Sequence, residues 1–184
     1  MRYHEIIRLK DGRACCLRNG DEQDGQAALD SFMLAHAQTD FLRTYPDEKQ
    51  MTPEQEAQFL KETTASDRAI ELLAEVEGHV AGLAGIAPVG HCDKERHRAT
   101  FGISIDRNYW GLGIGRALTE ACIACARAAG YAQLELDVVA DNARAVGLYQ
   151  RLGFVEYGRN PRGFRSRLTG WQPVTLMRME LDGE

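Results

Sequence analysis

Hydrophobic and polar residues alternate along several short runs of the chain, and this spacing is typical of β-strands with one buried face. Such runs, or short apolar runs bounded by turn residues, lie at residues 3–9, 14–18, 69–76, 80–88, 99–105, 134–139, 154–157 and 174–181. Asp11-Gly12 and the segment 77–79 separate neighbouring runs and carry the glycine that tight hairpin turns favour. We therefore expect a sheet that contains hairpins.

Other stretches place apolar residues at helical spacing. They are residues 21–36, 52–63, 114–129 and 142–152. The second begins with Thr-Pro-Glu-Gln at 52–55, where Thr is a preferred N-cap, Pro fits the first helical position and Gln completes a capping box. Asp141 or Asn142 is the expected N-cap of the last helix. Gly130 and Gly153 follow the third and fourth stretches and are expected to end those helices.

The order of these elements predicts the topology of the sheet. A strand, a helix and a strand follow one another over residues 99–139, and such a unit joins two parallel strands by a crossover. We expect an α/β (α+β) fold, a single domain over residues 1–184, with a mixed, mostly antiparallel sheet and helices on both faces. The arginine-rich residues 160–171 are expected to form a loop.

Composition narrows the class of protein. The chain has 184 residues, of which 44% are hydrophobic and 27% charged, as in a soluble globular domain. Its formal net charge of -5 argues against a broad nucleic-acid surface and favours a cationic or neutral substrate. No apolar run reaches membrane-spanning length, and the first residues lack the apolar core of a signal peptide. We expect a cytoplasmic protein with no nucleic-acid or membrane partner.

The cysteines and histidines give little support to a metal or disulfide site. The cysteines are odd in number and lack secreted spacing, so we expect reduced thiols. Cys122-x-x-Cys125 has the spacing of a redox or metal motif, but it lies in a predicted helix beside apolar residues, which favours buried small hydrophobic side chains. His91, Cys92 and His97 fall in a polar loop without a second pair of ligands, so we expect no metal.

A glycine-rich turn connects the strand 99–105 to the helix 114–129. Gly111, Gly113 and Gly115 let backbone N–H groups approach a ligand with no Cβ between them, and the helix start adds unpaired donors and partial positive charge. The turn is therefore a candidate phosphate or pyrophosphate site. It matches neither the P-loop nor the dinucleotide-binding pattern, and a tight loop with close helix packing is the alternative.

Two motifs resemble one known family. Residues 110–117, Trp-Gly-Leu-Gly-Ile-Gly-Arg-Ala, are similar to the acyl-CoA pyrophosphate loop of the GNAT superfamily of N-acetyltransferases, Gln/Arg-x-x-Gly-x-Gly/Ala. Residues 142–154 resemble the family's second block, Asn-x-x-Ala-x-x-Leu-Tyr-x-x-x-Gly-Phe. The two motifs occur in the family's order, and the resemblance runs from about residue 69 to the C-terminus. It implies a cofactor-binding core at about residues 69–159.

The resemblance implies where acetyl-CoA, the acyl donor, lies. The strands 101–105 and 134–139 would splay apart, and the cofactor would occupy the wedge between them. The cofactor-binding positions that carry over are Ile103, Ser104 and Ile105 for the pantetheine arm, Trp110, Gly111, Leu112, Gly113, Ile114, Gly115 and Arg116 around the pyrophosphate, and Asn142 and Tyr149 in the second motif. Trp110 stands where the family has Gln or Arg, so its side chain is expected to pack and not to bind phosphate; Arg116 and Arg144 are candidates to supply positive charge instead.

The resemblance makes Tyr149 the candidate catalytic residue, with its hydroxyl near the thioester sulfur. A phenol within hydrogen-bond reach can protonate a leaving thiolate as a general acid. The alternative is that Tyr149 is only a core residue of an amphipathic helix.

The base that deprotonates the amine stays unassigned, because Thr100 occupies the place where many relatives have a Glu. Glu135 and Asp137 are the first candidates and Asp106 and His97 the weaker ones, with water as the alternative.

Three functions are compatible with these residues. The first is acetyl transfer to a primary amine of a small molecule, and the second is transfer to a protein N-terminus or lysine. The third is a non-catalytic acyl-CoA-binding module. Residues 32–44 and 161–171 are expected to shape the acceptor pocket, where the arginines would favour an acidic or phosphorylated acceptor: Arg159, Arg162, Arg165 and Arg167. The resemblance also suggests a homodimer.

Overall fold

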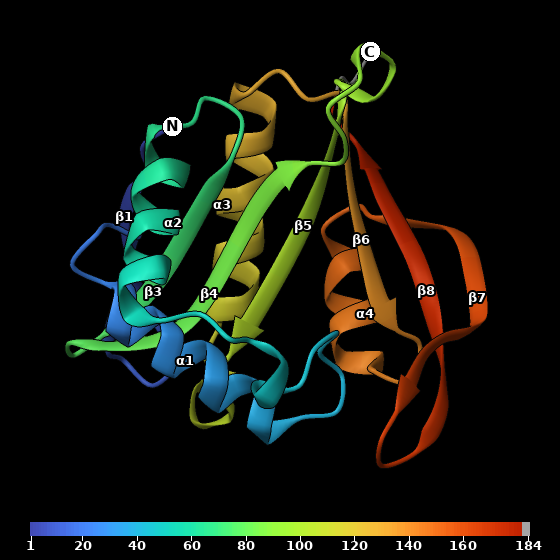
Figure 1. Ribbon diagram of the computed structural model, residues 1–184, viewed down its shortest axis with the longest axis horizontal. Helices are drawn as coiled ribbons and strands as arrows, with labels where there is room; N and C mark the ends of the chain where they lie inside the picture. The colour runs from blue at the N-terminus through green and yellow to red at the C-terminus, as the bar shows by residue number, and fades with distance from the viewer. Residues whose placement is uncertain (182–184) are drawn as a thin grey trace.

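The computed structural model describes residues 1–181 and consists of an eight-stranded sheet with helices on both faces (Figure 1). The strands lie in the order β1-β2-β3-β4-β5-β6-β8-β7. Their bounds are β1 His4–Arg8, β2 Ala14–Asn19, β3 Ile70–Val76, β4 His79–Pro88, β5 Arg98–Ile105, β6 Gln133–Val139, β7 Val155–Ser166 and β8 Gly170–Glu180. Only β5 and β6 pair in parallel, as the crossover predicts, and the other neighbours are antiparallel.

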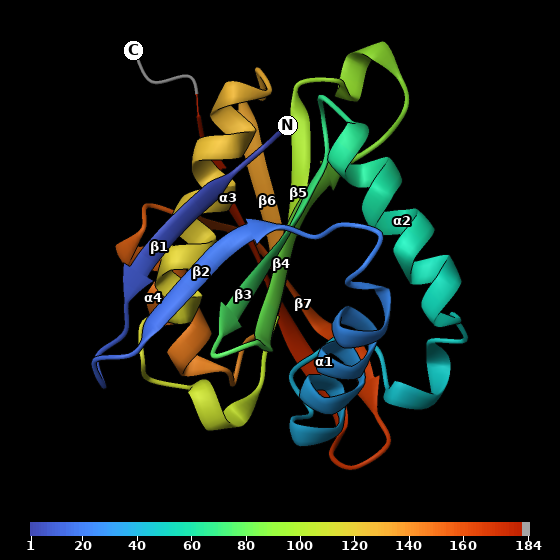
Figure 2. The same cartoon turned by 90° about the vertical axis from the view of Figure 1, so that its left-hand side faces the viewer.

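Four α-helices cover the sheet: α1 Gly25–Gln38, α2 Pro53–Ala65, α3 Ile114–Ala128 and α4 Ala143–Arg151. Figure 2 shows α1 and α2 on one face and α3 and α4 on the other. Successive side chains of β3 point to opposite faces of the sheet, so this strand packs against helices on both faces. Leu72 packs in the core beneath α3, while Leu73 packs with Leu60 of α2. The expected fold class is confirmed. Within residues 1–181, no helix combines the length and the apolar character needed to cross a membrane.

The helix starts follow from local sequence. Thr52 caps α2: its side-chain oxygen accepts from the Gln55 backbone at 3.3 Å, and the Gln55 side chain accepts from the Thr52 backbone at 2.9 Å. The predicted capping box is thus confirmed. Asn142 caps α4, with Oδ1 accepting from the Ala145 backbone at 3.2 Å. Between β5 and α3 the chain forms the short 3₁₀ helix η3, Arg107–Tyr109.

The expectation of a loop at residues 160–171 is wrong. β7 continues to Ser166 and β8 begins at Gly170, so the two strands form a long hairpin. β7 is one of the two edge strands of the sheet, and the residues of its second half are mostly solvent-exposed and polar, so they show no alternation. Pro161 and Gly163 fall in the irregular stretch between Asn160 and Phe164, where an edge strand tolerates a missing donor. The sequence signals of a loop are here the signals of a bulged edge strand.

Candidate active site

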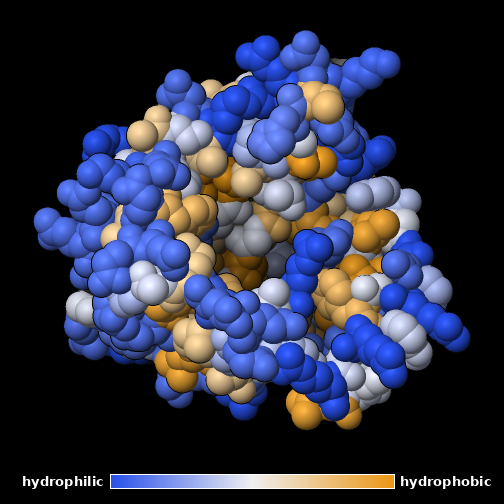
Figure 3. Space-filling view, viewed as in Figure 1, coloured by the Kyte–Doolittle hydropathy of each residue, from blue (hydrophilic) through white to orange (hydrophobic). Residues whose placement is uncertain are grey.

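The parallel pair opens part-way along its length. Only Arg98, Ala99 and Thr100 of β5 pair with β6, whereas β5 continues beside β4 to Ile105. β6 continues in the same way beside β8 to Val139. Figure 1 shows the two strands diverging, and the space-filling view from the same side shows a hollow over this opening (Figure 3). From Phe101 onward, the edge of β5 that faces β6 has no strand partner, so a peptide-like ligand could pair with it.

The turn after β5 leads directly into α3. Gly111 and Gly113 adopt φ values of +86° and +109°, a conformation that residues with a Cβ rarely adopt. A Cβ on Gly113 would meet no atom within 4 Å, so the space in front of the turn is open. Gly113 is the N-cap of α3, and no side chain bonds to the first N–H groups of this helix. These donors, at Ile114 to Arg116, lie where the sequence predicts an anion site, which stays a prediction.

Trp110 packs beside this turn. Its indole Nε1 donates to the Ile105 carbonyl at 2.9 Å, and the guanidinium groups of Arg107 and Arg144 lie 5.5 and 5.3 Å from its ring. An Arg144 nitrogen is 3.9 Å from the position that a Cβ on Gly111 would occupy, which places a cation at the turn. Arg116 instead pairs with Glu120 at 2.9 Å on the exposed face of α3.

Tyr149 lies in the core next to the opening. Its ring packs edge-on against Phe101 of β5 and Phe154, with centroid distances of 6.1 and 5.8 Å. The residue is 7% exposed, and burial raises the pKa of its phenol above the usual range, so the hydroxyl stays protonated. The hydroxyl makes no hydrogen bond to the described residues. Asn142, at the start of the same helix, uses Oδ1 for the cap, which leaves its amide nitrogen as the group for a ligand.

The structure separates the candidate bases. Glu135 is 8% exposed and bound by Arg98, with Nε–Oε1 and Nη2–Oε2 distances of 2.5 and 2.8 Å. Asp106 accepts from Gln38 Nε2 at 2.9 Å and from the Asn108 backbone at 3.0 Å. Burial opposes its ionisation, but these hydrogen bonds prevail and lower the pKa of the Asp106 carboxyl. His97 precedes the closed end of the strand pair, and Asp137 is exposed on the opened part of β6.

The structure shows a partly buried carboxyl group on β3, that of Glu71, which no sequence motif singled out. It lies between buried Ile70 and Leu72, and burial raises the pKa of Glu71 to about 8, with the nearby Glu56 adding to the effect and Lys49 opposing it. An acid placed between the apolar residues Ile70 and Leu72 is the sequence signal that could have found it.

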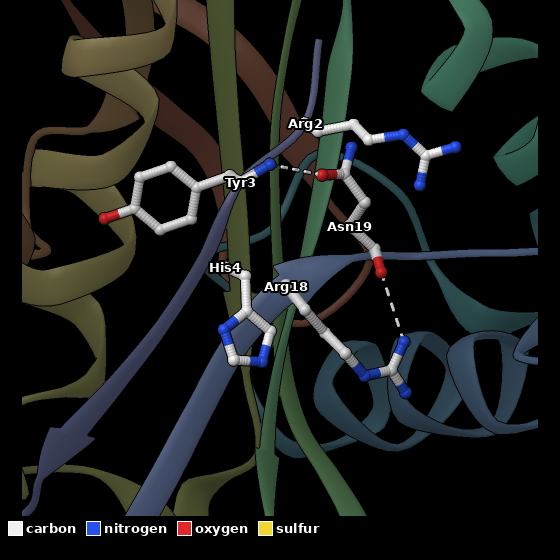
Figure 4. A pocket seen from close by; sticks show the side chains of 5 residues that line it. All are labelled: Arg2, Tyr3, His4, Arg18 and Asn19. Carbon is white, nitrogen blue, oxygen red and sulfur yellow. Dashed lines mark hydrogen bonds between the residues drawn. The ribbon is translucent and has the colours of Figure 1, made fainter.

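Two other features of the described residues are the cysteines of α3 and a hollow at β1 and β2. Cys122 and Cys125 are buried in α3 with free thiols, as expected, and burial raises the pKa of both. A hollow at β1 and β2, lined by Arg2, Tyr3, His4, Arg18 and Asn19, lies at the far side of β3 and β4 from the opening (Figure 4). There the Asn19 side-chain oxygen accepts from the Tyr3 backbone N–H at 2.7 Å. The Asn19 backbone carbonyl accepts from the Arg18 guanidinium at 3.1 Å. The polar groups of Tyr3, Arg18 and Asn19 that take part in these bonds therefore already have partners within the protein.

Comparison with known proteins identifies the family. The sequence model of the acetyltransferase (GNAT) family matches residues 33–154, about two thirds of the chain. The chain belongs to this family. The match includes both motifs that suggested it, the GNAT turn before α3 and the block over α4. The described fold is therefore a GNAT fold, with its parallel strands splayed next to the turn.

Three relatives illustrate the similarity. An acetyltransferase of the GNAT family from Streptococcus pneumoniae has a solved structure with a TM-score of 0.85 and 32% identity, covering 90% of this chain and 99% of that one. Human N-acetyltransferase 8B is 36% identical over 89 residues, 48% of this chain and 39% of its own length. L-amino acid N-acyltransferase MnaT of Escherichia coli (strain K12) is 28% identical over 111 residues, 60% of this chain and 64% of its own. The matches thus span less than two thirds of these two curated relatives.

Proposed function

We propose that this protein transfers the acetyl group of acetyl-CoA to a primary amine of a small molecule, by direct attack with both substrates bound. The observation that carries the proposal is the position of Tyr149, a buried and protonated phenol beside an opened strand pair whose neighbouring turn presents free N–H groups. In this proposal residues 1–184 act as one transferase domain, with the cofactor-binding core at about residues 69–159.

The residues at the opening fit acetyl-CoA. The open turn at Gly113 and the first N–H groups of α3 suit a pyrophosphate, and Arg144 adds positive charge at Gly111. The unpaired edge of β5 suits the amide groups of the pantetheine arm, with Ile103, Ser104 and Ile105 supplying backbone groups. When bound, acetyl-CoA supplies an activated acetyl thioester.

Tyr149 has the properties of a general acid for this transfer. Its phenol remains protonated, so it can donate a proton to the sulfur when the carbon–sulfur bond breaks. Phe101 and Phe154 fix the plane of its ring, which orients the hydroxyl without a competing hydrogen bond within residues 1–181. The hydroxyl is then regenerated by a proton from solvent or from the product nitrogen.

The contacts around the hollow support a small acceptor. The segment after α1 is bonded to the β7–β8 hairpin through Asp40, which accepts from Ser166 Oγ at 2.6 Å and from Gln172 Nε2 at 3.0 Å. The hydroxyl of Tyr45 also accepts from the Arg167 backbone at 2.7 Å. These bonds hold the segment after α1 against the hairpin, an arrangement that favours a compact acceptor over a polypeptide. The E. coli relative, named for an L-amino acid, supports the same class of acceptor.

Two alternatives have weaker support. The hairpin arginines favour an acidic acceptor or a protein, but Arg167 is paired with Asp47 at 2.8 Å, and Arg162 and Arg165 stack on exposed Trp171 at 5.3 Å each. These three guanidinium groups therefore already contact Asp47 or Trp171 and are less available to an acceptor. A non-catalytic acyl-CoA-binding module would not need the protonated phenol of Tyr149.

A panel of acceptors tests the proposal. Release of free thiol from acetyl-CoA would be followed with L-amino acids, polyamines, short peptides and a buffer control, and acetylated products identified by mass spectrometry. We expect turnover with a small amine and none with peptides. Turnover with peptides alone would favour a protein acceptor, and acetyl-CoA binding without turnover on any class would favour the binding module.

A further inference from the structure

A row of three residues crosses the sheet at the level of the opening, on the face covered by α1 and α2. Glu71 of β3 is paired with Gly85 of β4, and Gly85 is paired with Gly102 of β5. Directly paired residues point to the same face, so Glu71 is the only member of the row with a side chain on that face. The two glycines leave a trough that runs from Glu71 to the opened edge of β5.

The carboxyl group of Glu71 lies in this trough. A Cβ on Gly85 would collide with Glu71 Oε2, so the side chain reaches across β4 toward β5. A Cβ on Gly102 would meet nothing within 4 Å, so the space beyond the carboxyl group is open. Neighbouring strands are about 4.8 Å apart, which brings the carboxyl group within about one strand spacing of β5. Figure 3 shows the molecule hollowed on this face.

Within residues 1–181, no cationic side chain pairs with this carboxyl group. The nearby Lys49 is paired with Glu56 of α2, with Nζ 2.7 Å from Oε2, although the angles leave that oxygen without an aligned hydrogen bond. Lys49 Nζ also lies 4.1 Å from the centre of the Phe32 ring of α1. The ring of His36 stacks on the same Phe32 ring, with 3.6 Å between the ring centres. Among residues 1–181, Glu71 makes no ion pair or side-chain hydrogen bond.

We propose that Glu71 is the general base that takes a proton from the ammonium group of the acceptor. This inference rests on the proposed function. One proton passes from the nitrogen to a carboxylate oxygen of Glu71, directly or through one water, and the freed lone pair can then attack the thioester carbonyl carbon. Glu71 releases the proton to solvent after the transfer.

The alternatives are less suited to this role. Thr100, at the place where many relatives have a Glu, points to the same face as Gly102, and the carboxyl group absent there is supplied from β3. Glu135 is held by both nitrogens of Arg98, and Asp106 by Gln38. Asp137 is exposed to water on β6 and is the remaining rival.

The surroundings of Glu71 match a base that works near neutral pH. Burial and then the charge of Glu56 on α2 raise its pKa to about 8, while Lys49 lowers it. The other titratable groups nearby are His36 of α1, whose pKa is lowered mainly by burial, and Cys122 of α3 on the opposite face of the sheet, whose pKa is raised mainly by burial. A base with a pKa near the working pH takes a proton effectively and releases it again.

Substitution of Glu71 tests the proposal against a matched control. Glu71→Gln should lower kcat about 100-fold or more, leave the Kd for acetyl-CoA unchanged and remove the acidic limb of the kcat profile; Glu71→Asp should restore part of the rate. Glu75→Gln changes a carboxyl group on the same strand and face, which pairs with Arg18, and should leave kcat unchanged. Loss of the acidic limb in Asp137→Asn and not in Glu71→Gln would overturn the assignment.

A second readout does not depend on turnover. The glutamate side-chain carboxyl signals of the protein without acetyl-CoA would be titrated by NMR, and one signal, absent in Glu71→Gln, should have a midpoint near pH 8. A midpoint for Glu71 near the usual 4.5 would contradict the proposal. If the wild type binds acetyl-CoA but acetylates no amine, the proposed function fails and the role of Glu71 with it. If the wild type is active and Glu71→Gln equals it, only the Glu71 proposal fails.

Discussion

The ring of Tyr149 meets the ring of Phe101 edge-on, at 6.1 Å between centroids and 83° between planes. This contact joins α4 to β5 at the residue where β5 loses its pairing with β6. It therefore places the candidate acid at the inner end of the opening, where a thioester on the edge of β5 would lie.

The first prediction concerns the hydroxyl of Tyr149. Tyr149→Phe keeps the ring contacts with Phe101 and Phe154 and removes only the proton donor, so kcat should fall by about 100-fold or more while the Kd for acetyl-CoA barely changes. Thiol release and calorimetry measure the two quantities. Tyr157→Phe, on the exposed edge strand β7, is the control and should behave as wild type. An unchanged kcat in folded Tyr149→Phe would remove this residue from the mechanism.

The second prediction concerns the turn before α3. Gly113→Ala forces a Cβ onto a residue with φ of +109°, which should cost about 1–3 kcal/mol and tilt the N–H groups that we propose bind the pyrophosphate. Both thermal stability and acetyl-CoA affinity should fall. Gly130→Ala strains the opposite end of α3, where φ is +74°, and should lower stability alone. Equal loss of affinity in both variants would show that the turn has no specific part in binding.

The third prediction concerns pH and stability. The pKa of Glu71 is about 8 in the folded protein and near 4.5 in the unfolded chain, so the folded state binds the proton more tightly between these values. The contribution of the Glu71 carboxyl group to the stability of the folded state is fully present below pH 4.5 and is lost as pH rises through 8. Urea unfolding should therefore show that Glu71→Gln gains stability over wild type by a few kcal/mol between about pH 5.5 and pH 8.5. A difference that does not change with pH would mean that Glu71 ionises normally.

The fourth prediction concerns the border of the acceptor site. Asp40→Ala removes the acceptor of Ser166, Thr169 and Gln172 and should free the hairpin from the segment after α1. The KM for the amine should rise several-fold, while the Kd for acetyl-CoA stays constant because the α3 turn is unaffected. Asp30→Ala removes an exposed carboxyl group of α1 that bonds only Gln26 in the described structure, and serves as the control. A change in acetyl-CoA affinity in Asp40→Ala would contradict the assignment of these hydrogen bonds to the acceptor site alone.

The fold was largely predictable because its elements carry strong local signals. Thr52 and Gln55 form the capping box that their spacing predicts, and the parallel pair follows from a helix between two strands. The hairpin was missed because β7 is a polar edge strand with Pro161 in a bulge, and polar edge strands lack the alternation on which strand prediction depends.

The candidate site could be proposed from the sequence only where its residues form a continuous motif. The turn at Gly113 and the helix of Tyr149 are continuous motifs that can be recognised in the sequence alone, although the contact between Tyr149 and Phe101 is not local. Glu71 is different, because its surroundings depend on its pairing with Gly85 and on the pairing of Gly85 with Gly102, and neither glycine is its neighbour in sequence. The ion pair between Arg98 and Glu135 is equally non-local. Only the structure shows that Glu135, one of the first candidate bases, is bound by an arginine.

The most direct test of the central claim is a single-turnover reaction with equal amounts of protein and acetyl-CoA and an excess of the best amine. Free thiol and N-acetylated product should appear together, in equal amounts, only when the amine is present and far more slowly in Tyr149→Phe. Bound acetyl-CoA that releases no thiol with any amine would contradict acetyl transfer. Thiol released before the amine is added would contradict direct attack.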